Sequence, residues 1–152
     1  MRTVGDPEVV RSLKARLEML RPDSARRWGT MTPQEMLCHL GDAAAMVLRT
    51  RPRPAPIPPR RRPIVKAVVL WAPLPWPRGF PTSPMLNPKA DGTQPSEFAR
   101  DLARAIAGID GIATARPDAL EPVHGVLGTM TLRDWQRWAY RHTHHHLRQF
   151  GL

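Results

Sequence analysis

Four histidines lie near the C-terminal end, in the stretch RHTHHHLRQF that spans residues 141–150. A helix turns by about 100° per residue, so His142 and His146 would share one face, about 40° and one turn apart. His145 would be displaced by about 60° to the other flank, and His144 would face water. Two imidazoles at i and i+4 can hold one metal ion, as in the HExxH zinc motif. The glutamate of that motif is missing here, so a zincin protease is not expected.

His39 is the candidate for a third ligand, because a metal needs at least one more protein donor. Glu35 and Asp42 would lie on its flank, each within about 60°, and Gln149 shares the side of His142. Any of these could orient an imidazole or act as a base. The alternatives are a helix cap for Glu35, which we favour, a solvated charge for Asp42, and ordinary hydrogen-bonded polar residues for the histidines.

Further residues could line a pocket beside the metal: Trp135, Trp138, His145 and His124. We favour a core role for the tryptophans, which supply large buried areas, and a loop role for His124. Cys38 would point about 100° away from His39, so we expect a small packed residue rather than a nucleophile or ligand.

Capping signals and apolar spacing predict the helices that must position these residues. Asp6 and Pro7 start a helix that Pro22 ends, and Thr32, Pro33 and Glu35 start a second that runs to about Arg49. Ile64–Trp71 reads as a short buried helix. Another helix starts near Pro95, with apolar residues from Phe98 to Ile112 on one face, and the last runs from Thr131 to Gly151. The expected fold is all-α, a four-helix bundle with long Pro-rich crossover connections and one short extra helix, forming one domain over residues 1–152.

Two proline-rich segments interrupt this pattern. Residues 50–63 (TRPRPAPIPPRRRP) should form an extended connector, and residues 72–94 a long irregular loop that covers one end of the bundle. Residues 114–130 should form another loop.

The net charge of +10 comes almost entirely from arginine, a skew that we attribute mainly to genomic base composition. It leaves open attraction to nucleic acid or to a small anion. One cysteine excludes an intramolecular disulfide, and we expect no signal peptide, no membrane span and a cytoplasmic setting.

Two sequence blocks resemble the DinB-like superfamily, including its YfiT-like members. The first is WGTMTPQEMLCHL at residues 28–40, and the second combines Trp135 with YRHTHHHLRQFG at residues 140–151. The segment PLPWPRG at residues 73–79 also matches one uncharacterised branch. The branch often carries His-Pro-x-x-Gly before the last helix, where this chain has His124-Gly125.

The resemblance implies a four-helix bundle, often a homodimer, with a divalent metal, usually zinc or nickel. The matching ligand positions are His39, His142 and His146. Some relatives are thiol-dependent S-transferases or isomerases. The resemblance therefore implies a low-molecular-weight thiol as a cofactor. It identifies no catalytic residues in this chain.

Three functions therefore compete. The first is a metal-dependent enzyme of the thiol S-transferase or hydrolase type, acting on a small molecule. The second is a bundle that a non-catalytic metal stabilises. The third, which we do not favour, is a nucleic-acid-binding module that uses Arg49, Arg51, Arg53 and Arg60 to Arg62.

Overall fold

Three helices begin at the capping motifs predicted from the sequence. In the computed structural model of the chain, which describes residues 1–53 and 62–152, α1 (Pro7–Glu18) follows Asp6, whose carboxylate accepts a hydrogen bond from the Glu8 N–H. α2 (Pro33–Val47) and α5 (Leu132–Gln149) each begin with a complete capping box. These side chains satisfy backbone N–H groups that have no partner within the helix, which explains why the starts were predictable.

The remaining described elements are α3 (Arg62–Trp71), α4 (Phe98–Thr114), two 3₁₀ turns and one small hairpin. The turns are η1 (Pro84–Leu86) and η2 (Pro117–Ala119). In the hairpin, β1 (Val123–His124) pairs antiparallel with β2 (Gly128–Thr129), within a range predicted to be a loop. The described part of the chain is mostly helical, which confirms the all-α class.

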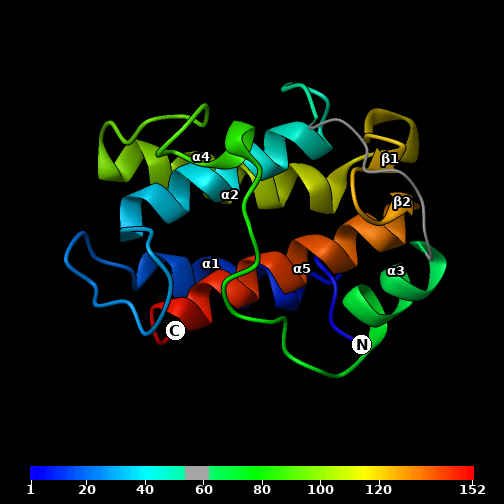
Figure 1. Cartoon of the computed structure of the whole chain (residues 1–152), viewed down its shortest axis with the longest axis horizontal. Helices are drawn as coiled ribbons and strands as arrows, with labels where there is room; N and C mark the ends of the chain where they lie inside the picture. The colour runs from blue at the N-terminus through cyan, green and yellow to red at the C-terminus, as the bar shows by residue number, and fades with distance from the viewer. Residues whose placement is uncertain (54–61) are drawn as a thin grey trace.

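The helices pack in pairs around a shared apolar core. α2 and α4 run side by side, and α5 lies beside α1 and contacts α2 and α4 (Figure 1). Gly108 of α4 faces the Cβ atom of Ala44 so closely that an added Cβ would overlap it. The close approach of α2 and α4 therefore depends on this glycine.

A long irregular crossover follows α3 and passes over the face of α5 on its way to η1 and α4 (Figure 1). At its start, the Arg141 guanidinium donates to the carbonyl oxygens of Ala72, at 2.7 Å, and Leu74. Near its end, η1 contacts α2. The crossover was expected to cover one end of the bundle, but it lies across the side where α2 and α5 face each other.

Asp42 of α2 fixes the far end of this crossover. Its fully buried carboxylate accepts hydrogen bonds from the Thr93 backbone N–H and hydroxyl, at 2.7 and 2.6 Å, and from Arg104, at 2.8 Å. Arg51 also contacts Asp42 and donates to the carbonyl oxygens of Met85 and Asp91, each at 2.9 Å. Burial alone would raise the pKa of Asp42, but the hydrogen bonds from Thr93 and Arg104 lower it below its usual value. Asp42 is thus not a solvated charge.

α3 differs from its prediction in two respects. Leu70 is buried, but Ile64 and Val68 are 65% and 53% exposed, so the helix is not a buried one. Only one of its faces packs on the rest of the protein, chiefly on α5. The helix also begins at Arg62, within the range expected to be extended, because Pro63 is tolerated in a first turn where no N–H partner is required. Residues 54–61 of the predicted connector lie outside the described residues.

Replacing Asp42 with alanine should destabilise the fold by about 3 kcal/mol, because Arg104 and Arg51 would lose their buried partner. Urea unfolding followed by circular dichroism measures this. Asp118→Ala is the control, since Asp118 forms an exposed pair with Arg116 and its loss should cost less than about 0.5 kcal/mol. Equal losses in the two variants would contradict this account of Asp42.

Candidate metal centre

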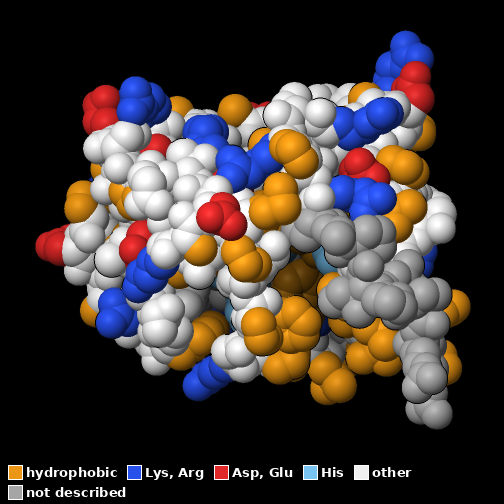
Figure 2. Space-filling model, turned by 45° about the horizontal axis from the view of Figure 1, so that its top comes forward, with side chains coloured by type: hydrophobic (Ala, Val, Ile, Leu, Met, Phe, Trp, Pro, Cys, Tyr) orange, Lys and Arg blue, Asp and Glu red, His pale blue; other side chains and the backbone are white. Residues whose placement is uncertain are grey.

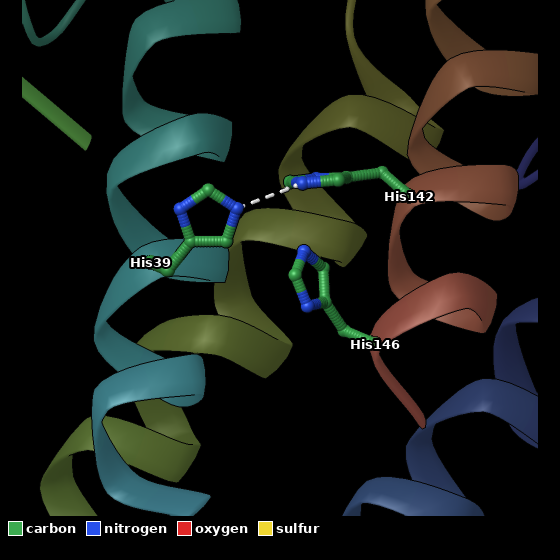
Figure 3. Close-up of side chains that lie close together, drawn as sticks. All are labelled: His39, His142 and His146. Atoms are coloured by element: carbon green, nitrogen blue, oxygen red, sulfur yellow. Dashed lines mark hydrogen bonds between the residues drawn. The ribbon is translucent and has the colours of Figure 1, made fainter. Parts of the chain in front are cut away.

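The structure brings together the three histidines that the sequence singled out. His39 projects from α2 towards His142 and His146, which project from successive turns of α5 (Figure 3). Their ring centroids are 4.8 Å apart in each pair, and their candidate ligand atoms all lie within 4.8 Å of one another. Nε2 of His39 and Nε2 of His142 are 2.9 Å apart.

Two of these rings are oriented by carbonyl oxygens. Nδ1 of His39 lies 2.8 Å from the carbonyl oxygen of Leu86, and Nδ1 of His146 lies 3.0 Å from Oε1 of Gln149. A carbonyl oxygen only accepts, so each Nδ1 carries the proton and each Nε2 keeps a free lone pair. This arrangement is typical of metal-binding histidines, whose second nitrogen is held by a hydrogen bond. With the His39 proton on Nδ1, the 2.9 Å contact between the two Nε2 atoms requires the proton of His142 to lie on its Nε2, and a bound metal would displace that proton.

Gln149 is itself held in place by the turn before α2. Its Nε2 donates to the carbonyl oxygen of Trp28 at 2.9 Å, which leaves Oε1 facing His146. The next residue, Gly29, has φ +82°, and a Cβ there would collide with the Gln149 amide. Gly29 therefore allows the turn to approach α5 closely enough to orient Gln149.

Burial keeps the three imidazoles neutral. His39 and His142 are buried, and His146 is partly buried. Desolvation lowers the pKa of all three, and repulsion between neighbouring rings lowers the pKa values of His142 and His146 further. Neutral imidazole is the form that binds metals.

Neither acidic candidate forms a hydrogen bond with His39. Glu35 accepts from the Thr32 backbone N–H at 2.7 Å and lies 3.6 Å from Lys89, which fits the favoured capping role. The Asp42 carboxylate is hydrogen-bonded to Thr93 and Arg104. It acts on His39 only electrostatically, by raising the pKa of that imidazole. The carbonyl oxygen of Leu86 takes the place expected for a side chain. Nothing in the sequence marks it, because every residue has such a group.

Cys38 is buried and contributes no donor to the three-histidine group. Desolvation and the neighbouring Asp101 raise the pKa of its thiol to about 11. The thiol is therefore protonated at neutral pH and is a poor nucleophile, as the helical geometry suggested.

Aromatic rings surround the cluster. Trp138 stacks on His142 at 4.5 Å, and Trp135 packs behind Trp138 at 5.4 Å, both in the core as predicted. On the crossover, Trp76 lies 6.0 Å from His142 and 5.9 Å from His145, a neighbour that the sequence analysis missed. Only its place in the PLPWPRG segment pointed to it.

His124 serves its loop. Nδ1 of His124 accepts hydrogen bonds from the backbone N–H groups of Val126 and Leu127, at 3.0 and 3.2 Å. The ring also lies 5.7 Å from Trp138, so it supports the wall behind the metal centre.

His144 was predicted to face water, but it is only partly exposed and also contacts α1. Its Nδ1 accepts a hydrogen bond from Arg16 at 3.0 Å, and its ring stacks on Tyr140 at 5.5 Å. The reason is that α1 packs against α5 on this side, so the back of α5 is not a solvent face.

Three arginines of the nucleic-acid hypothesis contact the chain itself. Arg49 lies 3.5 Å from the carbonyl oxygen of Asp118, Arg53 pairs with Glu121 at 3.0 Å, and Arg51 belongs to the Asp42 network. Arg60 and Arg61 lie outside the described residues, and Arg62 begins α3.

No protein-family model, curated protein or solved structure matches this chain. Among the described helices, none has the length and apolar character needed to cross a bilayer.

The protein should lose stability as pH falls from about 6.5 towards 4. Burial lowers the pKa values of His124 and His144 to about 4. The unfolded chain therefore takes up protons first, and unfolding becomes easier over this interval, by about 2 kcal/mol from the largely buried His124 and by less from the partly exposed His144. Urea unfolding in the presence of a chelator, at pH 7.0, 5.5 and 4.5, measures the effect. His124→Asn keeps an acceptor for the loop and should flatten the pH dependence; an unchanged slope would contradict the role of His124.

Proposed function

We propose that this chain is a metal-dependent enzyme in which His39, His142 and His146 hold one divalent ion. The observation that carries the proposal is the convergence of three imidazoles from two helices, with two Nδ1–H groups held by carbonyl oxygens. Orienting two rings in this way is unnecessary for apolar packing, and it directs their lone pairs towards the third ring.

The donor set fits zinc or nickel, since imidazole suits both metals. Within the described residues, the group of histidines, cysteines and acidic residues close enough to bind one ion contains these three members. Three protein ligands are typical of catalytic zinc sites, which keep an open position, whereas structural zinc sites usually have four. The ligand count therefore favours an ion with exchangeable positions.

Such an ion supplies Lewis acidity that lowers the pKa of a coordinated thiol or water and so favours the nucleophilic form. The protein residues contribute orientation and shielding. The Leu86 carbonyl and Gln149 fix two rings, and Trp138 and Trp76 cover the His142 side with apolar surface. His146 is the least buried of the three residues, and we infer that a small molecule would approach the ion from its side.

The resemblance to the DinB-like superfamily supports a more specific proposal. We assign α1, α2, α4 and α5 to a four-helix bundle of that type, which forms a homodimer and acts on a small molecule, either as an S-transferase with a low-molecular-weight thiol as cofactor or as a hydrolase. The support is the match of His39 and the His142–His146 pair to the ligand positions of the family.

A metal that only stabilises the fold is the second candidate. Its support is that the ligands join α2 to α5 and are largely buried, so an ion would cross-link two helices. The two functions differ in accessibility. A catalytic ion exchanges its non-protein ligands with added thiol, whereas a purely structural one does not.

The purified, untagged protein should contain about one zinc or nickel ion per chain. His142→Ala should lose it, because two imidazoles rarely retain an ion against dialysis. Elemental mass spectrometry after dialysis gives the stoichiometry. His144→Ala is the matched control, since His144 lies on the same helix but faces α1. The site would be refuted if His144→Ala lost the metal as fully as His142→Ala. It would also be refuted if the wild-type protein held no metal even after reconstitution.

Gln149→Leu should weaken zinc binding by about 10–100-fold while leaving one site per chain, because His146 would lose the group that orients it. Competition with a chromophoric chelator measures the affinity. Gln136→Leu is the control, since Gln136 lies on α5 and donates to the Ala113 carbonyl, away from the ligands. An unchanged affinity in Gln149→Leu would show that this hydrogen bond is dispensable.

A further inference from the structure

Two tryptophans from separate parts of the chain border one edge of the histidine cluster. The ring centre of His145 lies 5.2 Å from that of the neighbouring His146, and His145 is partly exposed. The ring of Trp28, from the turn before α2, lies 6.1 Å from His145, and that of Trp76, from the crossover, lies 5.9 Å from it. These rings form an aromatic edge next to the proposed metal centre. Figure 2 shows a hollow on one face of the molecule, bordered by hydrophobic side chains, with histidine atoms visible only at depth.

The guanidinium of Arg78 lies over the Trp28 ring of this aromatic edge. Its guanidinium carbon lies 4.4 Å from the centre of the Trp28 ring, a cation–π distance, and the residue is exposed. Among the described residues, none accepts a hydrogen bond from Arg78 or pairs with its charge. Its planar set of donors therefore faces solvent beside Trp28, without a partner among the described residues.

Other arginines near the three histidines already have hydrogen-bond acceptors within the protein. Arg137 and Arg141 donate to backbone carbonyl oxygens, and Arg51 and Arg104 bind Asp42. A second unused donor adjoins Arg78: Nε1 of Trp28 is shielded from solvent and has no acceptor among the described residues. Buried polar groups usually have hydrogen-bond partners, so the unpaired Nε1–H of Trp28 could donate to a bound ligand beside Arg78.

The charge balance around the cluster calls for an anion. Among the described residues, the three candidate ligands are all histidines, so no carboxylate among them would offset the charge of a divalent ion. Asp42 is the acidic group that acts on His39, and its charge is already balanced by Arg104 and Arg51. A substrate with a negative group would offset this excess.

We propose that Arg78, held over Trp28, binds the carboxylate of a small substrate whose reacting group lies at the three-histidine centre. This inference rests on the proposed function, because it needs the ion as the second anchor. An arginine fork binds a carboxylate with two parallel hydrogen bonds, and the faces of Trp28 and Trp76 would contact the apolar part of the substrate. Arg78 is thus assigned to substrate specificity rather than to the reaction itself.

The test uses the zinc-loaded full chain and ω-mercapto acids of three to six carbons, each paired with the corresponding ω-mercapto amide. The thiol anchors each probe on zinc, and the ratio of acid to amide affinity, measured by calorimetry, reports recognition of the carboxylate. For wild type, at least one chain length should favour the acid by about 10-fold. Arg78→Gln should bring that ratio near one while keeping one zinc per chain.

Arg133→Gln is the matched control. Arg133 is also exposed and stands over a tryptophan, Trp71, at 5.2 Å, but Trp71 belongs to α3 and not to the aromatic edge. It should keep the wild-type ratio. A ratio near one in zinc-loaded wild type, or an unchanged ratio in Arg78→Gln, would overturn the inference and leave the metal centre standing. A wild-type protein that retains no zinc would overturn the proposed function, and this inference with it.

Discussion

Three imidazoles buried close together cannot all be charged, and the rest of the site follows from that constraint. Desolvation lowers the pKa of each ring and so favours its neutral form; a neutral ring needs a partner for its N–H, and its buried lone pair needs a proton or a metal. The structure meets the first need with carbonyl oxygens of Leu86 and Gln149 and with the contact between His39 and His142. A divalent ion would meet the second for all three rings, after displacing the proton between His142 and His39.

The elements around the site make these partners available. Asp42 holds the end of the crossover through Thr93 and Arg51, and this positions the Leu86 carbonyl against His39. Gly29 lets the turn before α2 hold Gln149 against His146. The same two segments also carry Trp76, Arg78 and Trp28. The parts of the chain without regular structure therefore both orient the candidate ligands and form the aromatic edge next to them.

The sequence predicted what depends on local rules. The capping boxes at Thr32 and Thr131 and the spacing of His142 and His146 are properties of single helices, and the structure agrees with them. Features set by tertiary contacts were missed or wrong. His144 could not be placed without knowing that α1 packs there, and α3 looked buried because an apolar stretch does not reveal which neighbours exist. The Leu86 carbonyl has no signature in the residue type at all.

X-ray absorption spectroscopy of the zinc-loaded protein, with and without an added thiol, tests the central claim most directly. We expect three imidazole nitrogens and one or two further light atoms at about 2.0–2.1 Å, and a sulfur at about 2.3 Å after thiol is added. That result would place an ion with exchangeable positions between His39, His142 and His146. A sphere filled by four protein ligands, unchanged by thiol, would contradict the account and favour a structural metal instead.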